Sequence, residues 1–156
     1  MKWFVLTSLL FLTLVASGCS YSTSFVIVND ADYSIEVSYR IKAVPAGPRF
    51  LDVPPGVISA ADIETRDREK WTKLGSDHYR IDQVNRTVIV TLAPHEALWV
   101  TSMSHYIGGI DPNDVQDFPI QDISISGSEG EMKFTGDQAR QSFERESQVL
   151  YLLRYK

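Results

Sequence analysis

The sequence is poor in the residue types that mark several common protein classes. It has one cysteine among 156 residues, so no disulfide can form within one chain. Lys and Arg number 15 against 20 Asp and Glu, which gives a net charge of −5 and a pI of about 5.1. This acidic balance, with no basic stripe, excludes a typical nucleic-acid-binding protein. An apolar content of 44% excludes a disordered chain and indicates a globular protein with one core.

The motifs of common enzyme sites are also missing. The three histidines, His78, His95 and His105, have no helical i,i+4 spacing, and no His-Glu-x-x-His is present. No Gly-x-Ser-x-Gly elbow occurs to present a nucleophilic serine. We therefore expect no catalysis and no cofactor. A hydrolase with an unrecognised site stays open as an alternative.

The N-terminus has the pattern of an export signal. Lys2 supplies a positive charge, and residues 3–16 form an uncharged, mostly apolar stretch of 14 residues. A membrane-spanning helix needs about 20 residues, so this stretch is too short to span a bilayer. Its length and flanking residues predict a signal peptide over residues 1–18.

The end of this segment, Ala16-Ser17-Gly18-Cys19, resembles the lipobox of bacterial lipoprotein precursors. The resemblance covers about nineteen residues, and the only cysteine is at the required position. It departs from the family at Ala16, where leucine is more frequent. The resemblance implies cleavage before Cys19, lipidation of the Cys19 thiol, and acylation (typically palmitate) of the new amino group. Ser20, in place of aspartate, resembles the outer-membrane default, facing the periplasm, in a Gram-negative cell.

The mature chain is expected to hold a short tether and one domain. Residues 19–24 are interpreted as the lipidated tether, and residues 25–156 as a single domain. The five residues that follow the cysteine can span at most about 17 Å when extended. A protein anchored in this way would lie close to the membrane surface.

The dominant period of the remaining chain is two. Residues 33–41 alternate apolar and polar side chains, which is typical of a half-buried strand, and residues 25–28 are rich in β-branched side chains. These two runs predict an antiparallel hairpin. No long helical pattern alternates with the strands. The fold class expected is all-β: an antiparallel, immunoglobulin-like β-sandwich with seven to nine short strands and at most one or two short helices, with a small barrel as the alternative.

Further elements follow from local patterns. Residues 121–127 and 131–135 predict a hairpin, and residues 149–155, apolar on both faces, predict a central strand. Residues 60–75 leave two interpretations open: a short helix from Thr65 to Leu74, or a strand at residues 61–64 followed by a loop. Additional strands are expected at residues 78–81, 86–92 and 96–101, and one or two helical turns within residues 136–145.

An acidic loop at residues 108–119 offers possible cation ligands. Asp111, Asn113, Asp114 and Asp117 are oxygen donors of the kind that calcium prefers. The spacing departs from the EF-hand, because its sharp-turn glycine and final glutamate are missing. The alternative interpretation is a solvated acidic loop.

Aromatic residues provide a second candidate site. Trp99, Tyr106 and Phe118, with Trp71, could form a contact surface for a glycan or a peptide. Trp99 lies between two aliphatic residues on an expected strand and so points away from them. If those neighbours face the core, Trp99 is exposed or covers the second face of the sheet.

These observations predict a lipid-anchored, non-catalytic protein of the bacterial cell envelope. Cys19 would attach it to the membrane, and its role would be binding or assembly of another envelope component, expected to be a protein. The long loops or a sheet edge would supply the contact surface. A β-sandwich that binds a small ligand, either a glycan or calcium, is the main alternative.

Overall fold

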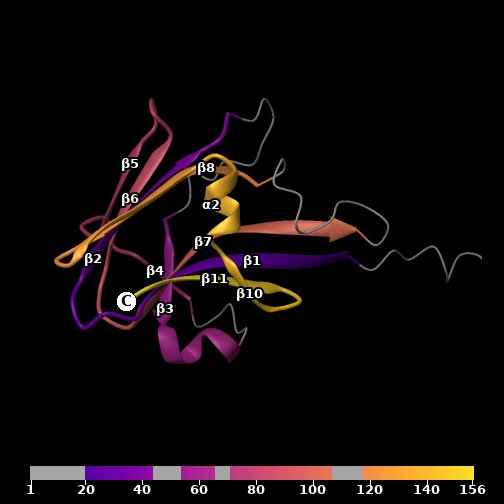
Figure 1. Cartoon of the computed structure of the whole chain (residues 1–156), viewed down its shortest axis with the longest axis horizontal. Coiled ribbons are helices and arrows are strands. Elements are labelled where there is room, and N and C mark those ends of the chain that lie inside the picture. Colours follow the sequence, from indigo (N-terminus) through magenta and orange to yellow (C-terminus); the bar gives the residue numbers. More distant parts are fainter. Residues whose placement is uncertain (1–19, 44–53, 66–70, 107–117) are drawn as a thin grey trace, which may run out of the picture.

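Two β-sheets pack face to face in the computed structural model, which describes residues 20–43, 54–65, 71–106 and 118–156 (Figure 1). Sheet A has six strands and sheet B has five. All pairings are antiparallel except one, between the first and last strands. The predicted all-β sandwich is therefore confirmed.

The strands of each sheet, in spatial order, are as follows. Sheet A contains β10 (Glu144–Ser147), β11 (Leu150–Tyr155), β1 (Ser20–Asn29), β7 (Glu96–Tyr106), β3 (Gly56–Ser59) and β4 (Thr72–Lys73). Sheet B contains β5 (Tyr79–Asp82), β6 (Thr87–Leu92), β2 (Ile35–Ile41), β8 (Ile120–Gly127) and β9 (Gly130–Thr135). A 3-10 helix, η1 (Ala60–Thr65), follows β3, and a short α-helix, α2 (Asp137–Gln141), follows β9.

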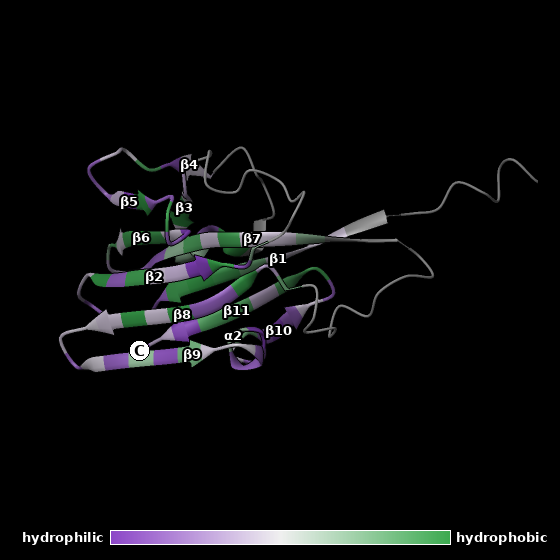
Figure 2. Ribbon diagram, turned by 90° about the horizontal axis from the view of Figure 1, so that it is seen from above, coloured by the Kyte–Doolittle hydropathy of each residue, from purple (hydrophilic) through white to green (hydrophobic). Residues whose placement is uncertain are grey.

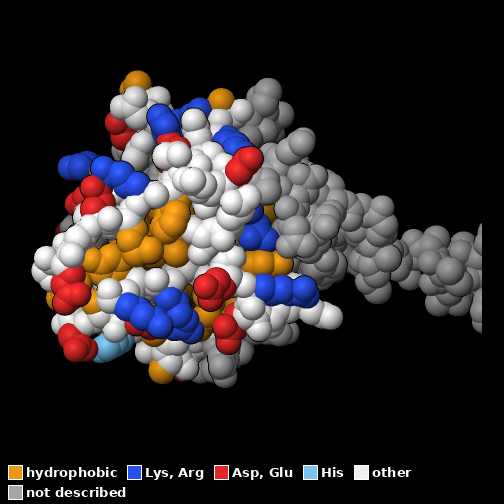
Figure 3. Space-filling view, in the orientation of Figure 1, with side chains coloured by type: hydrophobic (Ala, Val, Ile, Leu, Met, Phe, Trp, Pro, Cys, Tyr) orange, Lys and Arg blue, Asp and Glu red, His pale blue; other side chains and the backbone are white. Residues whose placement is uncertain are grey.

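The main core lies between the two sheets. Strand β2 shows why the alternating pattern folds this way: Ile35, Val37, Tyr39 and Ile41 are buried, whereas the residues between them are exposed or half-buried. Figure 2 shows the same alternation of hydrophobic and hydrophilic residues along β2 and β8. On one face, hydrophobic side chains are visible between the sheets, flanked by charged side chains (Figure 3).

Strand β1 is buried on both faces, which explains its unbroken apolar run. Phe25 and Ile27 belong to the core between the sheets. Val26 and Val28 belong to a second apolar cluster on the outer side of sheet A, together with Ile58 of β3. Strand β11 lies between β10 and β1, so its predicted central position is confirmed.

The predicted hairpin of residues 25–28 with residues 33–41 is wrong. Strand β1 lies in sheet A and β2 in sheet B, so the chain crosses between the sheets through the turn that joins them. β1 instead pairs in parallel with β11 and antiparallel with β7. Pairing with distant strands buries both faces of β1, which a local hairpin with β2 would not.

The tether is also shorter than expected. Residues 20–24 form the start of β1, and Ser20 and Ser24 are opposite Tyr106 and Ser102 of β7. Their serine-rich sequence is typical of a linker, but backbone hydrogen bonds to β7 hold them in the sheet. The domain therefore begins at Ser20 rather than at residue 25.

Two further expectations need correction. The described residues contain eleven strands rather than seven to nine, because sheet A also contains the short strand β3 and the short edge strands β4 and β10. In the ambiguous segment, η1 ends at Thr65, where the predicted helix would have begun, and β4 occupies residues 72 and 73. The alternative strand at residues 61–64 is η1 instead.

The hairpin predicted near residue 128 is confirmed as β8 and β9, and the helical turn after it as α2. Helix α2 buries Arg140 against two aromatic rings, with its guanidinium carbon 4.2 Å from the Tyr151 ring centre and 4.9 Å from that of Phe25. Among the described residues, no helix is both long enough and apolar enough to cross a membrane.

Candidate functional site

A cleft of about 720 Å³ lies where the ends of β3, β6 and β7 meet the β4–β5 turn. Such a volume is within the usual range of ligand sites. Its walls come from both sheets, because β4 ends sheet A and β5 ends sheet B on the same side of the sandwich. The lining residues are Ser34, Val57, Ile58, Ser59, Asp62, Thr72, Lys73, Leu74, Gly75, His78, Thr91, Ala93 and Glu96.

The aliphatic part of the cleft continues into the core. Val57 of β3 is buried, and Leu74 is partly buried against the main core. Backbone hydrogen bonds hold this wall, because the Leu74 N–H donates to the Pro55 carbonyl at 3.0 Å. The Thr91 N–H donates to the His78 carbonyl at 3.0 Å, which joins the turn to sheet B.

The charged residues at the cleft leave their strands on different faces. In sheet A, β3 lies between β7 and β4. Glu96 begins β7 and is opposite Ser59 of β3, and Asp62 follows in η1. Lys73 of β4 is opposite Gly56, whose Cβ position faces Trp71 and Trp99, so the Lys73 side chain lies on the outer face of sheet A. His78 ends the turn that leads to β5. The acidic residues Glu96 and Asp62 therefore line the cleft, and the Lys73 side chain points to the other face of the sheet.

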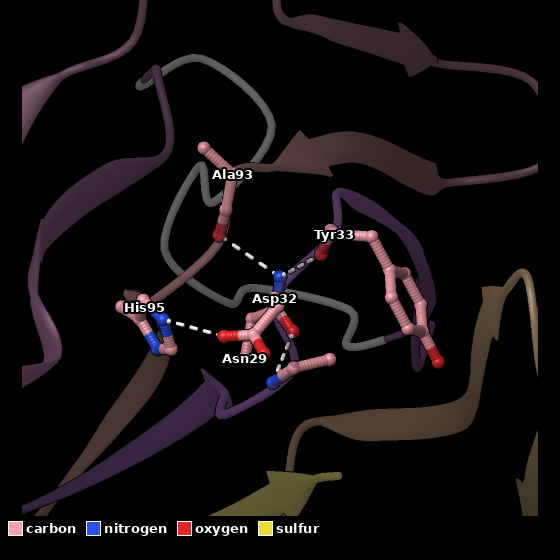
Figure 4. Close-up of polar contacts among 6 residues, drawn as sticks. Asn29, Asp32, Tyr33, Ala93 and His95 are labelled. Carbon is pink, nitrogen blue, oxygen red and sulfur yellow. Dashed lines mark hydrogen bonds and ion pairs between the residues drawn. The ribbon is translucent and has the colours of Figure 1, made fainter.

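The turns beside the cleft are held by buried and exposed polar contacts (Figure 4). Asn29, which is fully buried, donates from Nδ2 to the carbonyls of Tyr33 at 2.8 Å and Ala93 at 2.9 Å. The Ala93 N–H donates to Glu96 Oε2 at 3.0 Å. His95, at a positive φ of 58°, forms an exposed ion pair with Asp32 at 3.1 Å. These contacts fix the β6–β7 turn, which forms part of the cleft.

The cleft and the start of β1 are at opposite ends of the sandwich. Strand β7 runs antiparallel to β1, with Tyr106 opposite Ser20 and Ala97 opposite Val28. Glu96 therefore lies at the far end from Ser20, as Figure 1 shows for the two strands. The ten residues of β1 separate the two ends by about 30 Å.

The predicted aromatic contact surface is only partly assembled. Trp71 and Trp99 lie together over the outer side of sheet A, with ring centres 6.3 Å apart. The Trp99 indole donates to the Thr101 carbonyl at 2.9 Å. Phe118 is 1% exposed within the main core, so it cannot belong to a contact surface. For Tyr106, the structure describes only the backbone, as the last residue of β7.

Other predicted site residues lie outside the described residues. Cys19 immediately precedes the first described residue, Ser20. The possible calcium ligands Asp111, Asn113, Asp114 and Asp117 also lie outside. Within the part of the chain that the structure describes, no group of three or more His, Cys, Asp or Glu residues could hold a metal ion.

Sequence reasoning did not find the cleft, because its residues extend from Ser34 to Glu96 without a motif. The only local signal was the turn chemistry around residue 94, which marked the β6–β7 connection.

Comparison with known proteins adds no relative: no family model matches the chain, and no match was found among curated proteins or solved structures.

Proposed function

We propose that this protein is a lipid-anchored, non-catalytic lipoprotein of the bacterial envelope that binds or assembles another envelope component near the membrane. The supporting observation is that Cys19, the only cysteine, ends a lipobox-like segment and directly precedes the first residue of β1. Lipid on Cys19 would therefore be attached without a spacer. In a Gram-negative cell, Ser20 favours the outer membrane, facing the periplasm.

This attachment gives the domain a defined orientation. The end of β1 at Ser20 lies next to the bilayer, and the end with the β6–β7 turn lies about 30 Å further out. Two or three acyl chains would make the anchor stable, because each buried CH₂ contributes about 0.8 kcal/mol. The surfaces at the outer end are therefore the ones presented to an envelope partner.

The anchor is tested by metabolic labelling with an alkyne analogue of palmitate in cells that produce the full chain. We expect the wild-type protein to be labelled and to sediment with membranes. Cys19→Ser should be unlabelled and should keep its N-terminal segment, which mass spectrometry of the intact protein measures. Equal labelling of the two proteins would exclude Cys19 as the site of lipidation.

The binding role is tested by in-cell crosslinking of the full chain at native level, followed by mass spectrometry. The control is a version exported by a cleavable signal and lacking Cys19. One dominant protein partner that is lost with the anchor supports assembly at the membrane. Recovery of no protein partner in either form would contradict this role.

The cleft itself favours a second candidate, a domain that binds a small polar ligand such as a glycan. Its volume suits a small molecule, and its hydroxyl and carboxylate side chains can bind polar groups. Thermal melting of the purified protein with a panel of saccharides tests this candidate, and melting with calcium chloride tests the predicted calcium ligands Asp111, Asn113, Asp114 and Asp117. A concentration-dependent rise in Tm with one of them would support the small-ligand function.

A further inference from the structure

We propose that the free edge of β9 binds an extended segment of an envelope protein as an additional antiparallel strand of sheet B. Among the described residues, β9 pairs only with β8 and ends the sheet. Addition of a strand to a sheet edge is a recurring mode of peptide recognition. The edge is defined by the structure, and only the identification of its occupant as an envelope protein rests on the proposed function.

The backbone of β9 presents regularly spaced donors and acceptors at this edge. The N–H of Gly136, just after β9, donates to the Gln121 carbonyl beside it on β8 at 2.8 Å. Because residues of an antiparallel strand alternate between bonded and outward-facing positions, every second residue back from Gly136 is likewise bonded to β8. The N–H and C=O groups of Glu131, Lys133 and Thr135 therefore point away from β8, towards the free edge.

The other edge strands of the described sheets are less suited to such pairing. β4 has two residues, and β5 and β10 have four each, whereas β9 has six. The register of β10 is irregular beside Arg145, and irregularities of this kind protect edges. β9 pairs with β8 in unbroken register. Lysine on an edge also discourages pairing, but the charge of Lys133 is compensated by Glu131 at 2.9 Å.

The side chains of β9 specify the pattern of the added strand. Met132 and Phe134 are partly buried against the main core, and apolar side chains of an added strand would cover them. On the other face, Glu131 forms an ion pair with Lys133 and accepts a hydrogen bond from Ser124 at 2.9 Å. A basic residue opposite Glu131 and an acidic residue opposite Lys133 would extend this ion pair across the strands. Read from its N-terminus, the antiparallel segment is therefore apolar, acidic, apolar, basic.

A second copy of this chain fits the edge less well than an envelope protein does. The Tyr155 hydroxyl donates to the Gly130 carbonyl at 3.3 Å, and Tyr155 is opposite Asn29, at the end of β1 that is farthest from Ser20. β9 therefore starts at the outer end of the sandwich and runs back along it (Figure 2). Antiparallel pairing of two copies would put their Ser20 residues at opposite ends of the dimer. Two copies anchored in the same membrane could not form this pair.

The test is a selection from random twelve-residue peptides displayed on phage, against the purified full-length protein in a mild detergent. We expect the enriched peptides to share the apolar, acidic, apolar, basic pattern, and fluorescence anisotropy measures their affinities. Detergent keeps the protein in solution whether or not it is lipidated. Failure of the anchor, or of crosslinking in cells, therefore does not affect this result.

Methylation of single backbone nitrogens in a selected peptide tests pairing through the backbone. At the two charged residues, whose N–H groups would donate to Lys133 and Glu131, methylation should weaken binding at least about tenfold. At the two apolar residues, whose N–H groups would face away from β9, methylation is the matched control and should leave binding unchanged.

Variants of the protein locate the binding edge. Lys133→Pro removes an outward N–H that β8 does not use, so the folded hairpin should persist while peptide binding weakens at least about tenfold. Exchange of the ion pair, Glu131→Lys with Lys133→Glu, should reverse the order of the charges in the selected peptides and weaken binding of the original ones about threefold. Thr91→Trp, at an exposed position in the cleft, is the control and should change neither result. Circular dichroism confirms that each variant is folded.

Three outcomes would overturn the proposal. The first is that no peptides are enriched. The second is that the enriched peptides bind equally well when methylated at their charged residues, or bind folded Lys133→Pro as well as wild type. The third is sedimentation of the full-length protein as a dimer that Lys133→Pro converts to monomers, which would assign the edge to a second copy.

Discussion

At the scale of single residues, a few buried polar groups define the outer end of the sandwich. Asn29 joins the turn after β1 to the β6–β7 turn through its side-chain amide. Its Oδ1 also accepts the N–H of Ala31 at 3.1 Å. Tyr33 and Tyr155 contact each other through their hydroxyls, 3.5 Å apart, near the β8–β9 turn. These groups connect segments that are distant in the chain, so their loss should affect the whole domain.

Replacement of Asn29 is expected to be costly. Asn29→Ala leaves two turn carbonyls and the Ala31 N–H without this partner in a buried site, which should lower the free energy of unfolding by about 3 kcal/mol. Urea denaturation followed by tryptophan fluorescence measures the change. Ser128→Ala, in an exposed turn, is the control and should change it little. A loss no greater than that of the control would contradict the role given to Asn29.

Tyr155 predicts a loss of stability at alkaline pH. Its hydrogen bond with Tyr33, followed by desolvation, raises the pKa of Tyr155 to about 12 from an ordinary value of 10.0. Because the folded state holds the phenolic proton more tightly, this stabilisation is complete below pH 10 and is lost as the pH rises to about 12. The denaturant midpoint, measured from pH 9 to 12, should therefore decrease between pH 10 and about 12. Tyr155→Phe should have a smaller decline, and an identical decline would refute the assignment.

At the scale of elements, the β8–β9 hairpin shows how a local turn is constrained by its surroundings. Gly127 pairs with Gly130 at the end of the hairpin. A Cβ at position 127 would lie 2.7 Å from the Tyr155 hydroxyl and 2.7 Å from Cε2 of Tyr33. The glycine is therefore required by close packing of two aromatic rings, even though the turn itself is local.

Gly127→Ala should consequently destabilise the domain by about 2 kcal/mol, through overpacking against rings that have little room to move. Thermal denaturation monitored by circular dichroism measures this loss. In a Tyr155→Phe background, the same substitution should cost less, because one of the two close contacts is removed. Equal costs in both backgrounds would show that the tyrosine hydroxyl does not set the limit.

At the scale of the whole molecule, the position of β1 links the proposed anchor to the proposed binding site. The strand begins directly after Cys19 and extends over the length of the sandwich. The domain would thus hold its cleft at a set height above the membrane. This geometry matters only if the partner is itself positioned relative to the bilayer.

A linker insertion tests this arrangement. Twenty Gly/Ser residues inserted between Cys19 and Ser20 would add a flexible reach of about 25 Å. If height and orientation matter, crosslinking to the partner in cells should decline, although the anchor and the cleft remain. A two-residue insertion at the same site serves as control. Unchanged crosslinking with the long linker would mean that orientation is unimportant.

The fold class was predictable because its determinants are local. Alternating side chains in residues 33–41 and turn residues near 128 specify strands and a hairpin from contacts between near neighbours in sequence. The lipobox-like residues before Cys19 are likewise read from adjacent positions, and lipidation stays a prediction. The candidate site was not predictable in this way, because no local pattern marks the residues that line the cleft.

The sequence by itself determined most of the strands, the β8–β9 turn and the candidate anchor, because each depends on neighbouring residues. The tertiary structure alone decided that β1 and β2 occupy different sheets, since pairing with β7 and β11 buries both faces of β1. It also decided that the serines after Cys19 belong to a strand, and that Phe118 lies in the core. The cleft arose from the same long-range pairing, because β4 and β5 end their sheets on one side and bring the β4–β5 turn close to Glu96.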